Sequence, residues 1–168
     1  GVTSTWDAAL EGEAVLGADH ASATDDSTGT ITVVPGVAVD FVVEFDTVSP
    51  VVAGVPFGVV VTAKDSDTNI ARFYENSRTL VWTWNDATPS PNGTVPVTVG
   101  DGPQTFTGGI YTSTASFALY NAADTVATLT VTYTGSDAAD PADDITGTSG
   151  ASLAVGPNIQ SQFTINPT

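Results

Sequence analysis

Apolar and polar residues alternate along several short segments, and this alternation constrains the fold more than any other feature of the sequence. Side chains two positions apart point to the same face of a β-strand, so alternation predicts a strand with one face in a core. In segments 57–64, 79–84 and 126–133, the apolar faces consist of Phe57, Val59, Val61 and Ala63; Leu80, Trp82 and Trp84; and Leu129, Val131 and Tyr133. The segments are too short for helices and are separated by Gly, Pro, Asn and Asp, as in β-sandwiches and barrels.

The same reasoning extended along the chain predicts an all-β protein. The residues are mostly Val, Thr, Ala, Gly and Asp, and Val and Thr suit a pleated, half-buried surface. We expect strands near residues 30–34, 38–46, 57–64, 78–84, 94–99, 104–108, 113–120, 125–134, 151–155 and 160–165. Segment 6–16 has the pattern of a short helix, although Gly12 and Gly17 interrupt it.

The chain repeats one short arrangement near its two ends. In each copy a Val-containing strand, a Pro/Gly joint and a second strand with a Phe follow one another. Pro35 and Pro157 are 122 residues apart, and so are Phe41 and Phe163. The interval matches one sandwich domain. The repeat predicts a domain at 35–157, an N-terminal extension and strand at 1–34, and a C-terminal extension at 158–168. The chain is either one module of a linear array or a subunit that joins head to tail with copies of itself.

The charge of the chain restricts its partners. The chain contains nineteen acidic and three basic residues, which gives a net charge of −16. Phosphate binding needs clustered Lys and Arg, so we expect neither nucleic acid nor an anionic membrane surface as a partner. The longest apolar run, Val51 to Val61, is interrupted by Gly and Pro and is shorter than the roughly 20 residues of a membrane span, so membrane insertion is not expected. Lys64, Arg72 and Arg78 lie within 15 residues and concentrate the positive charge in one region.

Two absences bear on the cellular location. The chain contains no Cys, so disulfides are excluded, and no Met, even at position 1. A missing initiator Met is typical of a chain whose leader has been removed, or of a fragment. We therefore expect a secreted protein.

Several motifs resemble, in order, the immunoglobulin-like repeats of large bacterial and archaeal surface proteins. Val52-Ala53-Gly54-Val55-Pro56-Phe57 leads into the second strand, Ala115 to Tyr120 and Ala127 to Thr132 follow, and Ile145 to Gly150 closes the domain. The resemblance covers about residues 38–157 and departs from the family pattern after Asp65, where a Gly-Asn turn is usual. It implies an immunoglobulin-like antiparallel β-sandwich with terminal strand extensions, located outside the cell at its surface.

Two functions follow from the resemblance and the repeated joint. The first is a structural subunit of an extracellular filament, pilus or tube, assembled head to tail by β-strand complementation. In that case residues 158–168 are the candidate donor strand, since Phe163 and Ile165 alternate with polar residues, and Trp6 is a candidate anchor in an intersubunit pocket. The alternative is a repeat domain of a large adhesin or surface-layer protein. Either one could contact a glycan, a host surface or a neighbouring cell.

Two acidic segments are candidate Ca²⁺ sites. Asp65, Asp67 and Asn69 place oxygen ligands at alternate positions, as at the start of a calcium loop. The segment then departs from an EF-hand, because Ile70 replaces the turn Gly and position 76 is Asn. The competing interpretation is a polar turn held by local hydrogen bonds.

The second acidic segment lies before the last strands. Asp140, Asp143 and Asp144 form this second candidate, with a solvated acidic loop as its alternative. Bound Ca²⁺ would reduce the repulsion between copies of such an acidic chain.

Catalytic chemistry is not indicated. His20 is the only His and no Gly-x-Ser-x-Gly elbow is present, so a Ser–His–Asp hydrolase is not expected. One His and no Cys exclude a zinc site of the His and Cys type. We expect a protein that is not an enzyme.

Two further features suggest contacts with sugars. Trp82 and Trp84 share a face that is either core or, if it points outward, the sugar-stacking platform of a carbohydrate-binding module. Asn92-Gly93-Thr94 is an acceptor sequence for N-glycosylation in a Pro-rich turn.

Overall fold

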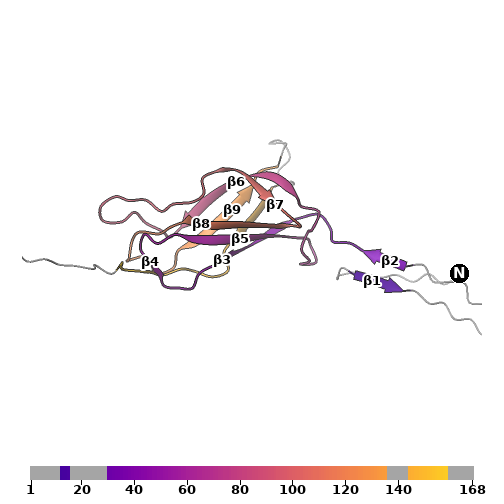
Figure 1. Cartoon of the computed structure of the whole chain (residues 1–168), viewed down its shortest axis with the longest axis horizontal. Coiled ribbons are helices and arrows are strands. Elements are labelled where there is room, and N and C mark those ends of the chain that lie inside the picture. The colour runs from indigo at the N-terminus through magenta and orange to yellow at the C-terminus, as the bar shows by residue number, and fades with distance from the viewer. Residues whose placement is uncertain (1–11, 16–29, 136–143, 159–168) are drawn as a thin grey trace, which may run out of the picture.

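The predicted all-β fold is confirmed. The computed structural model describes residues 12–15, 30–135 and 144–158. Over these residues the chain forms strands and no helix, and the main body is a β-sandwich of two antiparallel sheets (Figure 1). No described segment forms a helix with the length and apolarity that a membrane span requires.

Each layer of the sandwich is one antiparallel sheet. The first sheet has the strand order β3 (Asp40–Phe45), β5 (Phe57–Lys64) and β8 (Ile110–Phe117). The second sheet has the strand order β10 (Ile145–Thr148), β9 (Thr128–Tyr133), β6 (Asn76–Asn85) and β7 (Gly102–Phe106). A short parallel pair, β4 (Val51–Val52) and β11 (Val155–Gly156), joins the beginning of the sandwich to its last strand.

The inward faces are those that the alternation predicts. Val59, Val61 and Ala63 of β5 are fully buried, as are Leu129 and Val131 of β9. They meet a cluster of aromatic rings between the sheets, in which Phe117 lies 5.1 Å from Trp82 and 6.5 Å from Phe57, measured between ring centroids. Burial of these side chains is the main stabilising contribution to the fold.

The two sheets approach closely where β10 faces β3. Gly147 of β10 is buried, and a Cβ added to it would lie 2.0 Å from the carbonyl oxygen of Phe41 and 2.6 Å from the Phe41 Cβ. No side chain fits between the two backbones at this point. The absence of a side chain at position 147 therefore determines how tightly this edge of the sandwich closes.

The chain enters and leaves the sandwich at opposite ends of its long axis (Figure 1). We call the end that the chain reaches from β2 the entry end; it includes the linker 34–39 and the loop 65–75. The other end, the exit end, includes segments 46–56, 86–100 and 118–127 and leads out through β11. The connections before β3 and after β11 therefore lie on opposite sides of the sandwich.

A separate hairpin precedes the sandwich. β1 (Gly12–Val15) pairs antiparallel with β2 (Thr30–Val33). Neither strand packs against another described strand, and the hairpin stands apart from the sandwich in Figure 1. The expected short helix over 6–16 is therefore wrong at Gly12–Val15, where pairing with β2 outweighs a local helical pattern.

The remaining differences from the predicted strands occur where alternation is weak. The expected strand at 94–99 is reduced to an isolated bridge between Val97 and Ala118. The strands β4 and β10 were not predicted, because β4 has two residues and β10 reads Ile-Thr-Gly-Thr. The expected strand at 160–165 lies outside the described residues.

Candidate functional site

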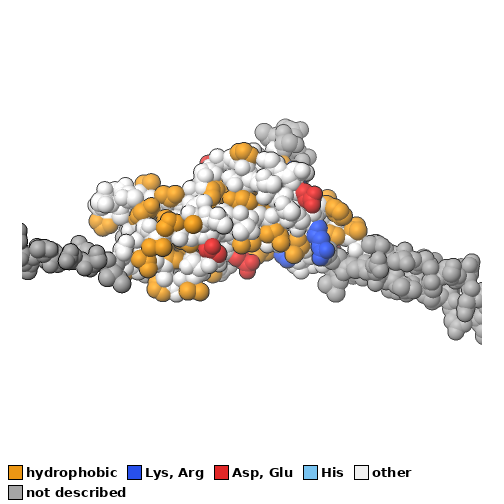
Figure 2. All heavy atoms as spheres, viewed as in Figure 1, with side chains coloured by type: hydrophobic (Ala, Val, Ile, Leu, Met, Phe, Trp, Pro, Cys, Tyr) orange, Lys and Arg blue, Asp and Glu red, His pale blue; other side chains and the backbone are white. Residues whose placement is uncertain are grey.

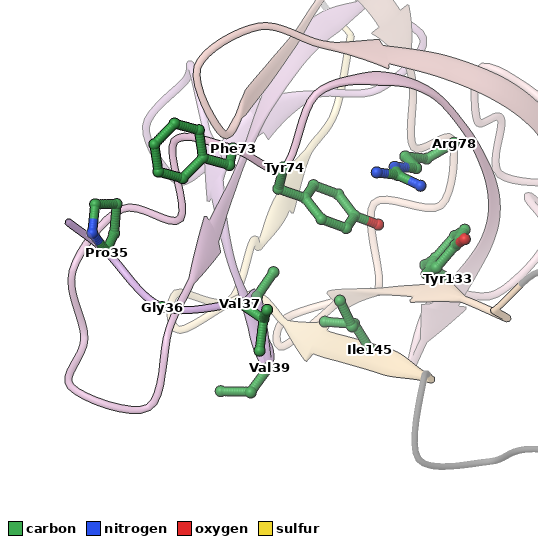
Figure 3. A pocket seen from close by; sticks show the side chains of 10 residues that line it. Pro35, Gly36, Val37, Val39, Phe73, Tyr74, Arg78, Tyr133 and Ile145 are labelled. Atoms are coloured by element: carbon green, nitrogen blue, oxygen red, sulfur yellow. The ribbon is translucent and has the colours of Figure 1, made fainter.

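A groove lies at the entry end of the described part of the chain (Figure 3). Its volume is about 650 Å³, within the usual range of ligand-binding pockets. The residues that line it come from the linker, the loop before β6, β6 itself, β9 and β10: Pro35, Gly36, Val37, Ala38, Val39, Phe73, Tyr74, Arg78, Tyr133 and Ile145. The walls are mainly apolar, with one cationic side chain among them.

Arg78 is held between two aromatic rings. Its guanidinium carbon lies 4.6 Å from the ring centroid of Tyr74 and 5.7 Å from that of Tyr133. Both distances are within the range of cation–π attraction. This attraction restricts the guanidinium, whose N–H groups have the geometry to bind a carboxylate.

Two buried polar atoms beside the groove lack partners. The Arg78 Nε and the Tyr74 hydroxyl have no hydrogen-bond partner among the described residues. Figure 3 shows the Tyr74 hydroxyl directed toward Arg78 and Tyr133. Burial raises the pKa of Tyr74 well above its ordinary value, the Arg78 charge lowers it by less, and Tyr133 adds to the rise, so the hydroxyl keeps its proton.

The linker that forms one wall of the groove is bonded to the sandwich. The Gly36 N–H donates to the Asp65 carboxylate at 2.8 Å, and the Val39 N–H donates to the Lys64 carbonyl at 2.8 Å. Asp65 also accepts from the N–H groups of Asp67 at 3.0 Å and Asn69 at 2.9 Å, and from the Asn69 side chain at 3.2 Å. One buried carboxylate thus holds both the linker and its own loop.

The pKa of Asp65 reflects these contacts. Desolvation raises the pKa, but the hydrogen bonds from Gly36, Asn69 and Asp67 lower it by more, so it lies below its ordinary value of 3.8. A group with a lowered folded-state pKa stabilises the fold above its unfolded pKa, and this contribution is lost as the pH falls through the folded pKa.

We expect Asp65→Asn to loosen the linker. The substitution removes the charge and replaces one accepting oxygen by a donor, so the Gly36 N–H should exchange faster with solvent, which hydrogen-exchange NMR measures. The decrease of the unfolding midpoint between pH 5 and pH 3 should also become less steep. Asp67→Asn is the control, because the Asp67 side chain is exposed and the residue contacts Asp65 through its backbone N–H. Equal Gly36 exchange in both variants would contradict this role.

The calcium predictions remain predictions. The Asp65 carboxylate is occupied by hydrogen-bond donors, which is the arrangement of a polar turn. Asp144 accepts from the Gly135 N–H at 3.1 Å, whereas Asp140 and Asp143 lie outside the described residues. Within the described ranges, no three His, Cys, Asp or Glu side chains are grouped closely enough to hold a metal ion.

The two tryptophans do not offer a sugar platform. Trp82 is buried and its indole packs against Phe117, while Trp84 is partly buried and stacks on Phe45 at 6.1 Å. Their shared face points into the sandwich, so a carbohydrate-binding module that uses this pair has no support in the geometry.

The other predicted residues are dispersed. Asn92 lies in an exposed loop at the exit end, where its side-chain oxygen accepts from the Thr94 hydroxyl at 2.9 Å. Trp6, His20, Phe163 and Ile165 lie outside the described residues. None of the described candidates joins the groove except Asp65, which contacts the linker.

Sequence reasoning located the positive charge but not the groove. Lys64, Arg72 and Arg78 do lie at the entry end, and Figure 2 shows Lys and Arg side chains gathered there. The groove itself needs Tyr133 and Ile145, which come from strands far along the chain. The spacing of residues along the sequence does not indicate that Tyr133 and Ile145 lie beside Arg78 in the fold.

Comparison with models of known protein families gives no match for this sequence, and comparison with curated proteins gives none either.

Proposed function

We propose that the chain is a structural module of an extracellular surface protein in which β-sandwiches follow one another covalently in a line. The observation that carries the proposal is a second copy of the last hairpin. The β1–β2 hairpin before the sandwich corresponds in sequence to the β9–β10 hairpin within it. A hairpin of this kind in front of a complete sandwich is the expected end of a preceding sandwich.

The correspondence lies in the segments that connect the paired strands. Residues 17–30 and 135–148 are 118 positions apart and agree at 8 of 14 positions. The agreeing residues of the first segment are Gly17, Asp19, Ala21, Asp25, Asp26, Thr28, Gly29 and Thr30. The long acidic connection and the Thr-Gly-Thr that follows it are thus duplicated.

A short insertion reconciles this interval with that of the repeated joint. Pro35 and Pro157 are 122 positions apart, so the second copy has gained four residues after Thr148. Residues 149–152 lie between β10 and the bridge at Leu153, where the chain leaves the sheet edge before rejoining it at β11. The two hairpins pair in different registers: Thr30 pairs with Val15, whereas its counterpart Thr148 pairs with Thr130.

The strand order supports an immunoglobulin-like module. The strands β3, β5 and β8 share a sheet as strands A, B and E do in immunoglobulin domains, and β10, β9 and β6 follow the order G, F and C. The strand β7 beside β6 occupies the place of C′ in variable-type domains. Surface proteins use such domains as spacers or adhesive modules, so we place this chain outside the cell.

A filament assembled by strand complementation is the competing proposal. Complementation needs a sheet position that a partner's strand completes. In the described residues, β10 extends the second sheet beyond β9, and β11 pairs with β4. The chain's own strands occupy these positions, which favours covalent neighbours.

The DNA that encodes the chain provides the direct test. We expect the reading frame to continue upstream of Gly1 and to encode a counterpart of Val55-Pro56-Phe57 about 118 residues before that motif, the interval of the duplicated hairpin. A secretory signal directly before Gly1, with no strand pattern upstream, would overturn the module array.

Sedimentation of the 168-residue chain distinguishes the two proposals at the protein level. A module taken from a covalent array should sediment as a monomer over a wide concentration range. Fibres that disappear when residues 159–168 are deleted would instead support strand complementation.

A further inference from the structure

We propose that the entry groove is a docking surface for the exit end of the preceding sandwich, a second copy of this module, and that Arg78 receives a carboxylate from it. This inference rests on the proposed array. Because Val33 and Pro35 are two residues apart, the end of β2 lies within about 7 Å of the groove. Whatever sandwich contains the β1–β2 hairpin must therefore place its exit end near the groove.

The linker restricts how the two modules can turn. Of the six residues between β2 and β3, five line the groove, and two of these are bonded to the β5 end and its loop through Asp65 and Lys64. A linker fixed in this way leaves the preceding module little freedom to move away from the entry end.

The two ends of the module differ in where their charged side chains lie. The three basic residues of the chain, Lys64, Arg72 and Arg78, all lie at the entry end. The exit end contains no basic residue and exposes the carboxylates of Asp46, after β3, and Asp86, after β6. The entry end also contains Asp65, Asp67 and Glu75, so attraction of a carboxylate there is local to the basic side chains and does not extend over the whole end.

Apolar side chains are exposed at both ends and scarce between them. Among the exposed large hydrophobic residues that the structure describes, only Val42 and Val81 lie on the middle of strands. The entry end exposes Val34, Val37, Val39, Phe73 and Ile110, and the exit end exposes Val48, Val52, Val55, Val95, Val97 and Val126. Two apolar surfaces at the ends of a module that continues in both directions are suited to bury each other.

Arg78 supplies the specific contact. Cation–π contacts with Tyr74 and Tyr133 restrict its guanidinium before any partner arrives, so less side-chain entropy is lost when a carboxylate binds. A charge-assisted hydrogen bond in an apolar surrounding is stronger than one in water. Asp46 and Asp86 are the exposed acidic residues of the exit end that such a contact could use.

A chain with one extra unit tests the contact. Pro157 corresponds to Pro35, so residues 1–157 followed by residues 36–168 give the complete chain with its sandwich repeated once. Because the sequence contains no Cys, Thr112→Cys in both copies allows two spin labels at exposed sites on β8. Pulsed electron–electron double resonance then measures the distribution of distances between the two labels, one on each sandwich.

We expect a narrow distance distribution for the repeated chain. Arg78→Leu in the second copy, whose entry end faces the first sandwich, should abolish the narrow component. The same substitution in the first copy is the matched control and should leave it unchanged. Phe73→Ala in the second copy, an exposed site where folding is not at risk, should also broaden the distribution.

A broad distribution in the unsubstituted repeated chain would overturn the docking proposal, as would equal effects of Arg78→Leu in the two copies. Failure of docking is distinct from failure of the array. A broad distribution with a module encoded upstream contradicts only the contact, whereas the absence of that module contradicts the proposed function itself.

Discussion

Gly147→Ala is expected to lower the free energy of unfolding by more than about 3 kcal/mol, at or beyond the upper limit usual for overpacked cores. The new methyl group would lie 2.0 Å from the Phe41 carbonyl oxygen, and backbone atoms cannot move aside as a flexible side chain can. Relief of the clash requires β10 to separate from β3, which exposes the core at this edge. Urea denaturation followed by tryptophan fluorescence measures the loss.

Gly150→Ala is the matched control. It makes the same chemical change three residues later, at an exposed site where nothing lies within 4 Å of the added Cβ. Its unfolding free energy should stay within about 0.5 kcal/mol of the parent, as for most surface substitutions. If the two variants were equally stable, β3 and β10 could not approach as closely as described.

Phe117→Ala is the second substitution with a large expected effect. The ring is fully buried and contacts Phe57, Trp82 and Trp84, with centroid distances of 5.1 to 6.5 Å. Its removal leaves a cavity between the sheets, and such truncations of Phe cost about 3–5 kcal/mol. The midpoint of thermal unfolding, measured by calorimetry, should fall accordingly.

Phe73→Ala separates stability from assembly. Phe73 is 70% exposed at the entry end, so its truncation in the single chain should have almost no effect on the unfolding midpoint. The same substitution is expected to broaden the distance distribution in the repeated chain. A large stability loss from Phe73→Ala, comparable with that from Phe117→Ala, would show that the ring belongs to the core of the module.

The fold was largely predictable because its strands are half-buried. Where one face of a strand meets the core and the other meets solvent, the sequence alternates, as in β3 and β6, and the predicted bounds fall within a few residues of the observed ones. The strand β4 has only two residues, and β10 alternates in burial but places Gly147 at one of its two inward positions, so its sequence lacks an apolar alternation. The hairpin strand β1 depends on a partner 15 to 21 residues away, so its local sequence resembled a helix instead.

The candidate site was much less predictable. Its cation was visible in the sequence, since Arg78 belongs to the one basic region. Its shape was not, because the groove requires the linker, β6, β9 and β10 to meet at one end of the sandwich. Asp65 was singled out for its spacing from Asp67 and Asn69, yet its hydrogen bond to Gly36 spans 29 residues and depends on how the linker enters the sandwich.

In the proposed array, the parallel pairing of β4 with β11 determines how the module carries load. The first part of the sandwich and its last strand run side by side in the same direction, joined by hydrogen bonds from the Val51 N–H to the Ala154 carbonyl and from the Ala53 N–H to the Gly156 carbonyl, each 2.9 Å long. Tension along the long axis pulls β4 toward the entry end and β11 toward the exit end. These bonds are then sheared together instead of being opened one after another, so the pair acts as a mechanical clamp along the direction in which an array would be stretched.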